Sequence, residues 1–243
     1  TSDAKNLLLF TKNTRLFDHD DSFDEIKNWT DEKKQAELDY MLKTIKSSWE
    51  FIDYTFILSG VSRGFTHQFV RTRQASYAQQ SLRVVDKSGF DYVVPERLRQ
   101  PDMRDALITY RKCMEQIDAH YNILRKQGVP AEDARGVLPT NICTKIVAKF
   151  NLRTLHETAK SRLSPRAQHE MRETFKMMVD QVVTVHPWAK PFLEPTEWSA
   201  PSMSRSLNKE EFKKEEQKDG NTEDTRESDN CRRFTYGCFR DFA

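Results

Sequence analysis

A long amphipathic segment near the middle of the chain constrains the fold more than any other feature. Over about residues 102–126, apolar side chains recur every three or four positions, at Met103, Leu107, Tyr110, Met114, Ile117, Tyr121 and Leu124. This period predicts one long helix with a single apolar face. Gly128 and Pro130 follow directly and mark its end. Most helical stability in proteins comes from burying such a face, so other elements must pack against it.

Helical and strand-like segments alternate on both sides of this helix. Further helices are expected over 31–50, 62–73, 131–135 and 153–162. Strands are expected over 51–58, 84–85, 92–94 and 142–150. A last helix is expected to begin with Ser164 as its N-cap and Pro165 at its first position. Its inward residues are Met171, Phe175, Met178 and Val182. The whole pattern predicts an α+β fold.

Bulk composition excludes several classes of protein. The chain has 243 residues, enough for one large domain or two small ones. Its formal net charge of +2 gives no surface-wide field to attract nucleic acid. No apolar run approaches the roughly 20 residues that span a bilayer, so no membrane partner is expected. No basic segment followed by an apolar one opens the chain, so we expect no signal peptide and a cytoplasmic location.

Composition also divides the chain into two parts. Residues 208–230 are dominated by Lys, Glu, Asp, Asn and Gln, with too little apolar surface to order the segment. We therefore expect a folded domain over 1–196 and a charged, flexible extension over 197–243. Cys113 falls on the apolar face of the long helix and is expected in the core. Cys231 and Cys238 could pair, but without a close Cys-x-x-Cys motif no metal site is expected, and they are interpreted as plain thiols.

The stretch Arg71–Arg83 concentrates positive charge in an otherwise nearly neutral chain. It contains three arginines and two serines and no Asp or Glu. An apolar helix-like run leads into it, so the arginines start from a packed element. Guanidinium groups placed in this way suit bidentate binding of a phosphate or a carboxylate.

This stretch resembles the signature of the flavin-dependent thymidylate synthases, in which Arg-His-Arg is followed by seven residues and a serine. Arg71, Arg73 and Ser81 stand in register with it, and Arg83 matches the arginine two positions beyond the serine. Further blocks recur in the family's order and spacing, namely Ala134–Pro139 with Asn141, Asn151–Arg153, Arg162 with Ala167–Gln168, and His186–Trp188. The resemblance covers residues 45–195.

The resemblance implies a fold, a chemistry and an assembly. The expected fold is α+β, an antiparallel sheet with packed helices, and 1–196 becomes the catalytic domain. Family members bind FAD, reduce it with NADPH, and take a one-carbon unit from methylenetetrahydrofolate. They transfer it to C5 of dUMP and reduce it, which forms dTMP. They are homotetramers whose active sites are shared between subunits.

The resemblance also assigns roles to individual residues. The positions that match nucleotide-binding ones are Gln68, Arg71, Gln79, Gln80, Ser81, Leu82, Arg83, Arg135 and Arg162. The positions that match FAD-binding ones are Arg71, Arg73, Ser76, Gln79, Asn151, Arg153 and Glu157. Arg162 and Ser81 are the residues expected to take part in catalysis. A phosphate dianion needs charged donors, and a fixed guanidinium such as Arg162 can stabilise charge that develops on the pyrimidine ring.

The chain departs from the family pattern at several positions. The signature's central histidine is Thr72, and the usual Asn-Glu pair is Ala78-Gln79. Other residues stand where the family has an aromatic or histidine side chain, namely Phe51, Val84 and Arg166. Three explanations compete: a divergent, viral thymidylate synthase; the same flavin and folate chemistry on another pyrimidine deoxynucleotide, by dCMP methylation or hydroxymethylation; or an inactive nucleotide-binding relative.

Each assignment also has a purely structural alternative. Arg71 and Arg73 could be a solvated helix end, and Asn151 could cap a helix instead of, or as well as, binding a ligand. Arg162 could pair with Glu157, although a spacing of five residues suits a helix poorly. Glu170 and Glu173 are most simply interpreted as part of a solvated helix face.

Overall fold

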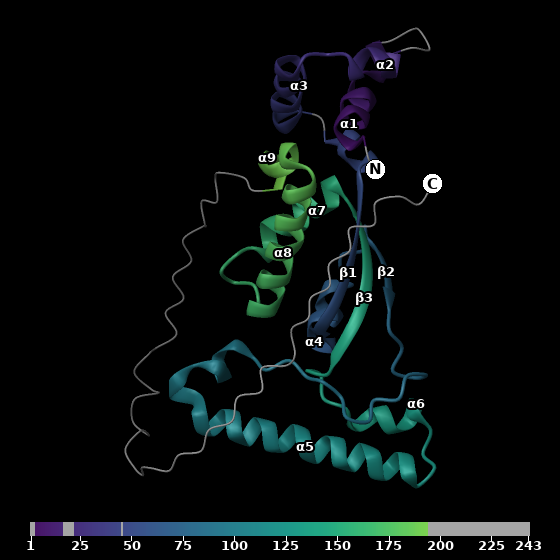
Figure 1. Ribbon diagram of the computed structural model, residues 1–243, viewed down its shortest axis with the longest axis vertical. Helices are drawn as coiled ribbons and strands as arrows, with labels where there is room; N and C mark the ends of the chain where they lie inside the picture. Colours follow the sequence, from purple (N-terminus) through teal and green to yellow (C-terminus); the bar gives the residue numbers. More distant parts are fainter. Residues whose placement is uncertain (1–2, 17–21, 45, 194–243) are drawn as a thin grey trace.

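The computed structural model describes residues 3–16, 22–44 and 46–193. Within these ranges the strands form one antiparallel sheet of three strands in the order β1–β3–β2, with bounds Asp53–Ser62, Cys143–Asn151 and Ser76–Gln79 respectively. The central strand β3 pairs Phe150 with Tyr54 of β1 and Ala148 with Tyr77 of β2. Helices lie along one side and at both ends of this small sheet (Figure 1), so the α+β prediction is confirmed at that level.

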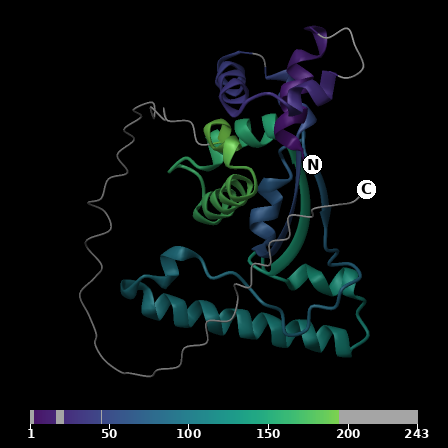
Figure 2. The same cartoon turned by 45° about the horizontal axis from the view of Figure 1, so that its top comes forward.

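One face of the sheet is buried beneath helices. Alternation along the strands places on this face Tyr54, Phe56, Leu58, Ile146, Ala148 and Phe150. Two helices, α4 (Arg63–Phe69) and α8 (His169–Val185), pack against it, as both views show (Figures 1 and 2). The rings of Phe69 and Phe150 have centroids 5.6 Å apart, and Phe175 lies 5.6 Å from Phe69. The contacts of Phe69 in α4 with Phe150 in β3 and with Phe175 in α8 therefore fix α4 on the sheet.

The remaining helices gather at the two ends of the sheet (Figure 1). At one end lie α1 (Ala4–Asn13), α2 (Ser22–Lys27), α3 (Asp31–Lys43) and a short 3-10 turn, η2 (Ser47–Phe51). At the other end lie α5 (Arg104–Lys126) and α6 (Ala131–Ala134). Beside α8 lie α7 (Leu152–Arg162) and α9 (Lys190–Leu193). Shorter 3-10 turns are η1 (Thr14–Leu16), η3 (Glu96–Arg99), η4 (Pro101–Met103), η5 (Arg135–Val137) and η6 (Pro187–Ala189).

The long helix α5 confirms the prediction for 102–126 but buries little of its surface. Met114 and Tyr121 are its buried residues, whereas Ile108 and Ile123 are 43% and 49% exposed. Cys113 is exposed, so the prediction that it lies in the core was wrong. The residue next to Met114 is rotated by about 100° around a helix, which takes its side chain off the buried stripe.

Several predicted boundaries were wrong for local reasons. The helix expected over 31–50 ends at Lys43, because Thr44 leaves helical geometry with φ −125° and ψ −115°. The helix expected to reach Arg73 ends at Phe69, and the Tyr77 hydroxyl donates hydrogen bonds to the carbonyls of Phe69 and Thr72 just beyond it. The helix α1 had no predicted counterpart.

The segment after α4 was predicted to be a polar loop, yet part of it is the edge strand β2. Its side chains alternate between exposed and half-buried, and the half-buried Tyr77 packs against Phe150. The strand expected at 84–85 is a turn, and Val84 is 83% exposed. Of the segment 92–94, Tyr92 forms one bridge with Ile142.

The last long helix begins four residues later than predicted. Ser164 does not cap it: the Ala167 amide donates to the Ser164 carbonyl in a turn, and α8 starts at His169. The inward set was correct, since Met171, Phe175, Met178 and Val182 are all among its buried residues. The extension expected over 197–243, with Cys231 and Cys238, lies outside the described residues. In the part of the chain that is described, no helix is long and apolar enough to cross a membrane.

Candidate functional site

The residues that the sequence singled out separate into groups along the sheet. The antiparallel register places Gln80 near the start of β3, where its amide donates to the Lys145 carbonyl at 2.9 Å. Ser76 lies opposite Lys149, near the other end of β3. We call the first group the basic end and define it as Arg63, Gln80, Ser81, Leu82, Arg83, Lys87 and Arg135. We call the second the paired end and define it as Lys46, Glu50, Asp53, Lys149, Asn151, Arg153 and Glu157.

The basic end is organised around Gln80. The Arg63 guanidinium donates through Nη1 to the Gln80 carbonyl at 3.3 Å. The Lys87 ammonium donates to Gln80 Oε1 at 2.8 Å. Just beyond, the Arg83 amide donates to Ser81 Oγ at 3.1 Å, which shapes a tight turn. Two cations therefore hold the start of the turn that presents Ser81 and Arg83.

The two arginines that were predicted to bind phosphate meet at α6. Arg83 donates through Nε and Nη2 to Glu132 Oε2, at 3.2 and 3.0 Å. Arg135 donates through Nε to the Glu132 carbonyl at 2.9 Å. Residue 132 thus holds one arginine with its carboxylate and the other with its backbone. The predicted pair is brought together, with an acidic side chain between them.

Positive charge is dense enough at the basic end to shift ionisation. Burial lowers the pKa of Arg63, and the charge of Arg135 lowers it further. Burial also lowers the pKa of Lys87, where the charge of Arg63 acts in the same direction while Cys143 and Asp91 oppose it. Arg63 is therefore close enough to both Lys87 and Arg135 for their charges to repel, an arrangement that favours binding of an anion.

The polar side chains of α4 hold neighbouring elements together. Gln68 donates to Gln168 Oε1 at 2.9 Å, and Gln79 donates to Thr66 Oγ1 at 2.8 Å. Both glutamines were predicted to contact the nucleotide, and in this structure both already have a protein partner. Their amide groups keep further donor and acceptor capacity.

Glu170 was interpreted as part of a solvated helix face, and that interpretation was wrong. Its two carboxylate oxygens accept from the Ser62 amide and the Ser62 hydroxyl, both at 2.7 Å. Ser62 Oγ in turn accepts from the Phe65 amide at 2.8 Å and so caps α4. Glu170 therefore ties α8 to the junction of β1 and α4, which positions Arg63.

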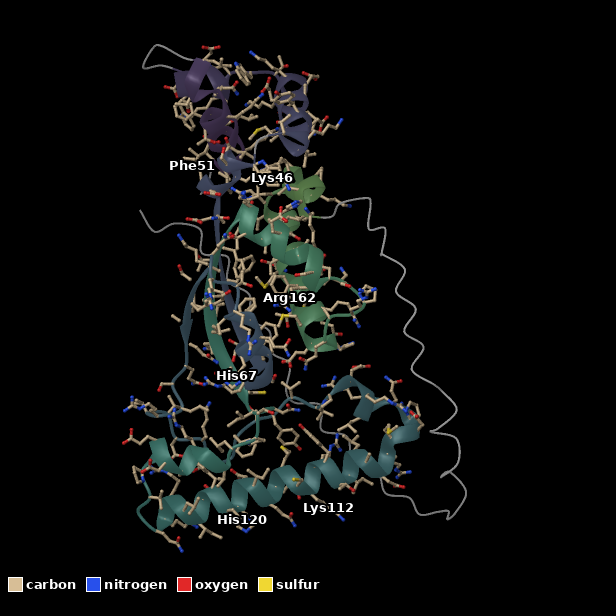
Figure 3. The ribbon with its side chains drawn as sticks, turned by 180° about the vertical axis from the view of Figure 1, so that it is seen from behind. Lys46, Phe51, His67, Lys112, His120 and Arg162 are labelled. Carbon is tan, nitrogen blue, oxygen red and sulfur yellow. The ribbon has the colours of Figure 1, made fainter. Side chains whose placement is uncertain are left out.

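Arg162 lies between the two ends of the sheet. Figure 3 shows it between the levels of Lys46 and His67 along the long axis of the molecule. Burial raises the pKa of the Tyr77 hydroxyl to about 12, and the nearby charge of Arg162 opposes that rise. Arg162 is therefore within electrostatic range of Tyr77, whose hydroxyl donates to the Thr72 carbonyl in the turn that carries Arg71 and Arg73. The structural alternative for Arg162 is not observed, because Glu157 pairs with Lys46 and Lys160 instead.

The turn between α4 and β2 carries Arg71 and Arg73, and both side chains are exposed. Neither forms an ion pair with a described residue. Thr72, between them, is half-buried and its carbonyl accepts from Tyr77. The two guanidinium groups therefore project from a fixed turn with their charge uncompensated in the described part of the chain.

The paired end differs, because nearly every charge there has a partner. Arg153 donates to Glu50 at 2.6 Å, Lys149 to Asp53 at 2.9 Å and Lys46 to Glu157 at 2.9 Å. Asn151 Oδ1 accepts from the Thr154 amide at 2.7 Å, so the predicted capping role is confirmed. The Asn151 side-chain nitrogen bonds to no residue within the described ranges.

Comparison with known proteins identifies the family. The family model described as thymidylate synthase complementing protein matches residues 4–188. The chain belongs to this family. It is 38% identical over 138 residues to the flavin-dependent thymidylate synthase of Nitratidesulfovibrio vulgaris, covering 54% of this chain and 56% of that protein. It is 38% identical to the Pyrococcus furiosus enzyme of the same name, covering 58% and 61%, and 37% identical to that of Sulfurisphaera tokodaii, covering 66% and 62%.

The aligned region spans about three fifths of the length of these relatives. The family resemblance inferred from Arg71, Arg73, Ser81 and Arg83 is thereby confirmed. The roles of the individual site residues stay predictions.

Sequence reasoning missed four residues that shape this family member's site: Arg63, Lys87, Glu132 and Glu170. Arg63 and Lys87 lie outside the signature and reach it only through the fold. Glu132 stands three residues before Arg135, a spacing that places two residues on one helix face and could have signalled their contact. Glu170 gave no signal, because its partner Ser62 is 108 residues away in sequence.

Proposed function

We propose that this protein is an FAD-dependent methyltransferase that transfers a one-carbon unit from methylenetetrahydrofolate to C5 of dUMP and reduces it, forming dTMP. The observation that carries the proposal is the match of residues 4–188 to the family model, together with a group of cations, Arg63, Lys87, Arg83 and Arg135, where the nucleotide phosphate is expected. The relatives named above carry the name of this activity. The same likeness supports the specific fold of flavin-dependent thymidylate synthases over residues 1–196.

The basic end supplies the contacts that a nucleotide phosphate needs. Arg83 and Arg135 offer charged donors. Gln80 and Ser81 offer neutral ones on the turn that carries Arg83, with Leu82 between Ser81 and Arg83. Charge-assisted hydrogen bonds to phosphate are shorter and stronger than neutral ones, so the arginines provide most of the affinity. Binding of phosphate to Arg83 must displace or share its contact with the Glu132 carboxylate.

Arg162 is positioned to act on the pyrimidine ring. C5 becomes a nucleophile when negative charge builds up over C5 and O4, as in an enolate, and that electron density then forms the bond to the one-carbon donor. A fixed guanidinium beside O4 stabilises that charge more in the transition state than in the ground state, which raises turnover. The half-buried position of Arg162 near Tyr77 restricts its movement. Gln68 and Gln79, on the α4 side, would contact the nucleotide beside it.

The residues present fit a flavin at the turn and the paired end. Arg71 and Arg73 have exposed, uncompensated guanidinium groups that suit the diphosphate of FAD and the negative charge of reduced flavin. Ser76 and the unused nitrogen of Asn151 offer further hydrogen bonds nearby. Arg153 and Glu157 would have to exchange their present partners, Glu50 and Lys46, to make contact. Bound FAD, reduced by NADPH, would supply the hydride that converts the transferred carbon to a methyl group.

We further propose a homotetramer with active sites shared between subunits. Within one chain, the turn that carries Arg71 and Arg73 leads into the end of β2 farthest from Arg83. A second subunit could bring its Arg71 to the nucleotide site. Exposed apolar side chains support association, with Phe51 62% exposed, Val84 83% exposed and Ile123 49% exposed.

One assay tests the proposed activity. The purified protein is incubated with FAD, NADPH and methylenetetrahydrofolate, with dUMP or dCMP as substrate, and the products are identified by mass. We expect dTMP from dUMP and little product from dCMP. Arg162→Ala should slow turnover far more than it weakens dUMP binding, whereas Arg111→Ala, on the exposed side of α5, should change neither. Binding of dUMP without product would indicate an inactive nucleotide-binding relative, and product from dCMP alone would overturn the proposed substrate.

A further inference from the structure

Two cations outside the signature converge on the basic end from different elements. Arg63 is the first residue of α4, where its amide is fixed by the Ile142 carbonyl at 3.1 Å. Lys87 lies beyond the signature, and its amide is held by the Tyr121 hydroxyl of α5 at 3.3 Å. The Arg63 side chain donates to the backbone carbonyl of Gln80, and the Lys87 side chain donates to the side-chain oxygen of the same residue. The fold thus fixes both groups beside Ser81 from two directions.

The charge balance separates these two cations from Arg83. Arg83 already donates two hydrogen bonds to one carboxylate oxygen of Glu132, and this ion pair neutralises much of the Arg83 charge. Arg63 and Lys87 form no ion pair with any described residue, and both are half-buried. They contact Gln80 through neutral acceptors only. The neutral amide oxygens of Gln80 do not compensate the charge of Arg63, and at Lys87 only Cys143 and Asp91 oppose the positive charge, without an ion pair, so both cations can still receive an anion.

We propose that Arg63 and Lys87 form part of the substrate phosphate site, binding the phosphate dianion together with Arg135 and Arg83. The inference rests on the proposed function, because it takes the anion to be the 5′-phosphate of dUMP. Like charges held together in a half-buried place destabilise the unliganded protein. A phosphate dianion that contacts all four cations offsets the repulsion between them and is attracted by each. The remaining donors of Arg63 and Lys87 are available for it, since Arg carries five N–H groups and Lys three.

The phosphate could instead belong to a cofactor, since FAD and NADPH also carry phosphates. The position of the two cations favours the substrate. Both contact Gln80, next to Ser81 and Arg83, and lie at the opposite end of β3 from Asn151 and Arg153. The test must nevertheless separate the two sources.

The test measures the binding of dUMP, deoxyuridine and FAD to Arg63→Met and Lys87→Met by calorimetry. Each variant is expected to bind dUMP roughly tenfold or more weakly, as for loss of a charge-assisted contact. Deoxyuridine lacks the phosphate, so its affinity should change less than threefold, and FAD affinity should not change. Lys126→Met, which removes the same charge from the exposed C-terminal turn of α5, should leave all three affinities unchanged.

Charge-preserving variants separate direct binding from a structural effect. Arg63→Lys and Lys87→Arg should keep most of the preference for dUMP over deoxyuridine if the charge meets the phosphate. Equal loss in Arg63→Lys and Arg63→Met, or in Lys87→Arg and Lys87→Met, would show that the residue acts only by shaping the Gln80 turn and would overturn the inference. So would loss of FAD binding with dUMP binding intact, or a dUMP to deoxyuridine ratio unchanged in both Met variants.

If one Met variant does not fold, as thermal unfolding would reveal, the other still decides, because the two residues reach the site from separate elements. Binding of dUMP to the wild-type protein separates failure of the proposed function from failure of the roles proposed for Arg63 and Lys87. Failure of the wild type to bind dUMP would reject the proposed function. Normal binding by the wild type with unchanged variants would reject this inference alone.

Discussion

The two ends of the sheet place their charged side chains differently. At the paired end, Arg153, Lys149 and Lys46 each contact a carboxylate from a different element. At the basic end, Arg63 and Lys87 contact only the amide oxygens of Gln80. Within the described ranges, Glu132 is the single carboxylate that contacts a predicted phosphate ligand, Arg83. The same small sheet therefore carries a compensated set of charges and an uncompensated one.

The difference indicates which set of cations can accept an anion directly and which set already has acidic partners. Exposed ion pairs contribute little stability, and each partner limits what the other can bind. Uncompensated cations held close together are unfavourable unless an anion completes the site. The basic end should therefore respond directly to an anionic ligand, whereas at the paired end Arg153 and Glu157 must first exchange their present partners to contact FAD.

The largest expected effect concerns Glu170, a carboxylate near the basic end that serves the fold. Glu170→Ala removes both acceptors from the buried Ser62 and should lower the free energy of unfolding by about 1.5–3 kcal/mol. Urea unfolding at pH 7 measures the change. Glu173→Ala is the matched control, because Glu173 faces His169 on the helix surface and should cost less than about 0.5 kcal/mol. Equal losses in the two variants would mean that the Ser62 contacts do not hold α8 to the sheet.

The sequence predicted the local features of this fold better than its contacts. The period over 102–126 was enough to predict α5, because one apolar stripe suffices to specify a helix. The end of α4 at Phe69 was not predictable, since it depends on Tyr77, which reaches back from an edge strand whose polar sequence resembled a loop. Polar edge strands become strands through pairing, and pairing partners are far apart in sequence.

The candidate site shows the same difference between local features, which the sequence predicts, and contacts between distant residues, which it does not. The arginines of the signature could be recognised from their spacing, and Asn151 from its position before a helix. Lys87 and Arg63 could not, because they join the site only when β1, α4 and α5 come together around Gln80. The interpretation of Glu170 failed for the same reason, since a solvated glutamate and one bonded to a distant serine look alike in sequence.

A smaller effect is expected at the paired end as the pH falls. His156 is buried against Trp49, with its ring nitrogens facing the Phe192 carbonyl and the Lys46 ammonium. Burial lowers the pKa of His156 below its ordinary 6.5, and the charges of Lys160 and Lys46 lower it further, against the opposing effects of the Phe192 carbonyl and Glu157. Below about pH 6.5 the unfolded chain therefore binds a proton that the folded chain does not, so stability falls as the pH drops.

Comparison of variants isolates this proton. Between pH 7.5 and 5, His156→Gln should lose part of the pH dependence of the unfolding free energy, by at most about 1.4 kcal/mol per pH unit for one proton. His120→Gln, on the exposed side of α5, should keep the wild-type slope (Figure 3). An unchanged slope in His156→Gln would show that the paired end is not where acid destabilises the protein.

The smallest expected effect tests the one carboxylate that compensates the basic end. Arg83 and Glu132 are 65% and 49% exposed at their side chains, so their ion pair is worth only about 0.2–1 kcal/mol. Glu132→Gln should release Arg83 for phosphate and tighten dUMP binding by up to about fivefold, the equivalent of that free energy. Asp133→Asn removes the same charge one residue away, without a contact to Arg83, and reports the general electrostatic effect. The difference between the two variants, measured by calorimetry, therefore isolates the contact itself. Weaker binding in Glu132→Gln would instead mean that Glu132 orients Arg83 for the phosphate, and that the basic end is already organised by its own acid rather than waiting for an anion.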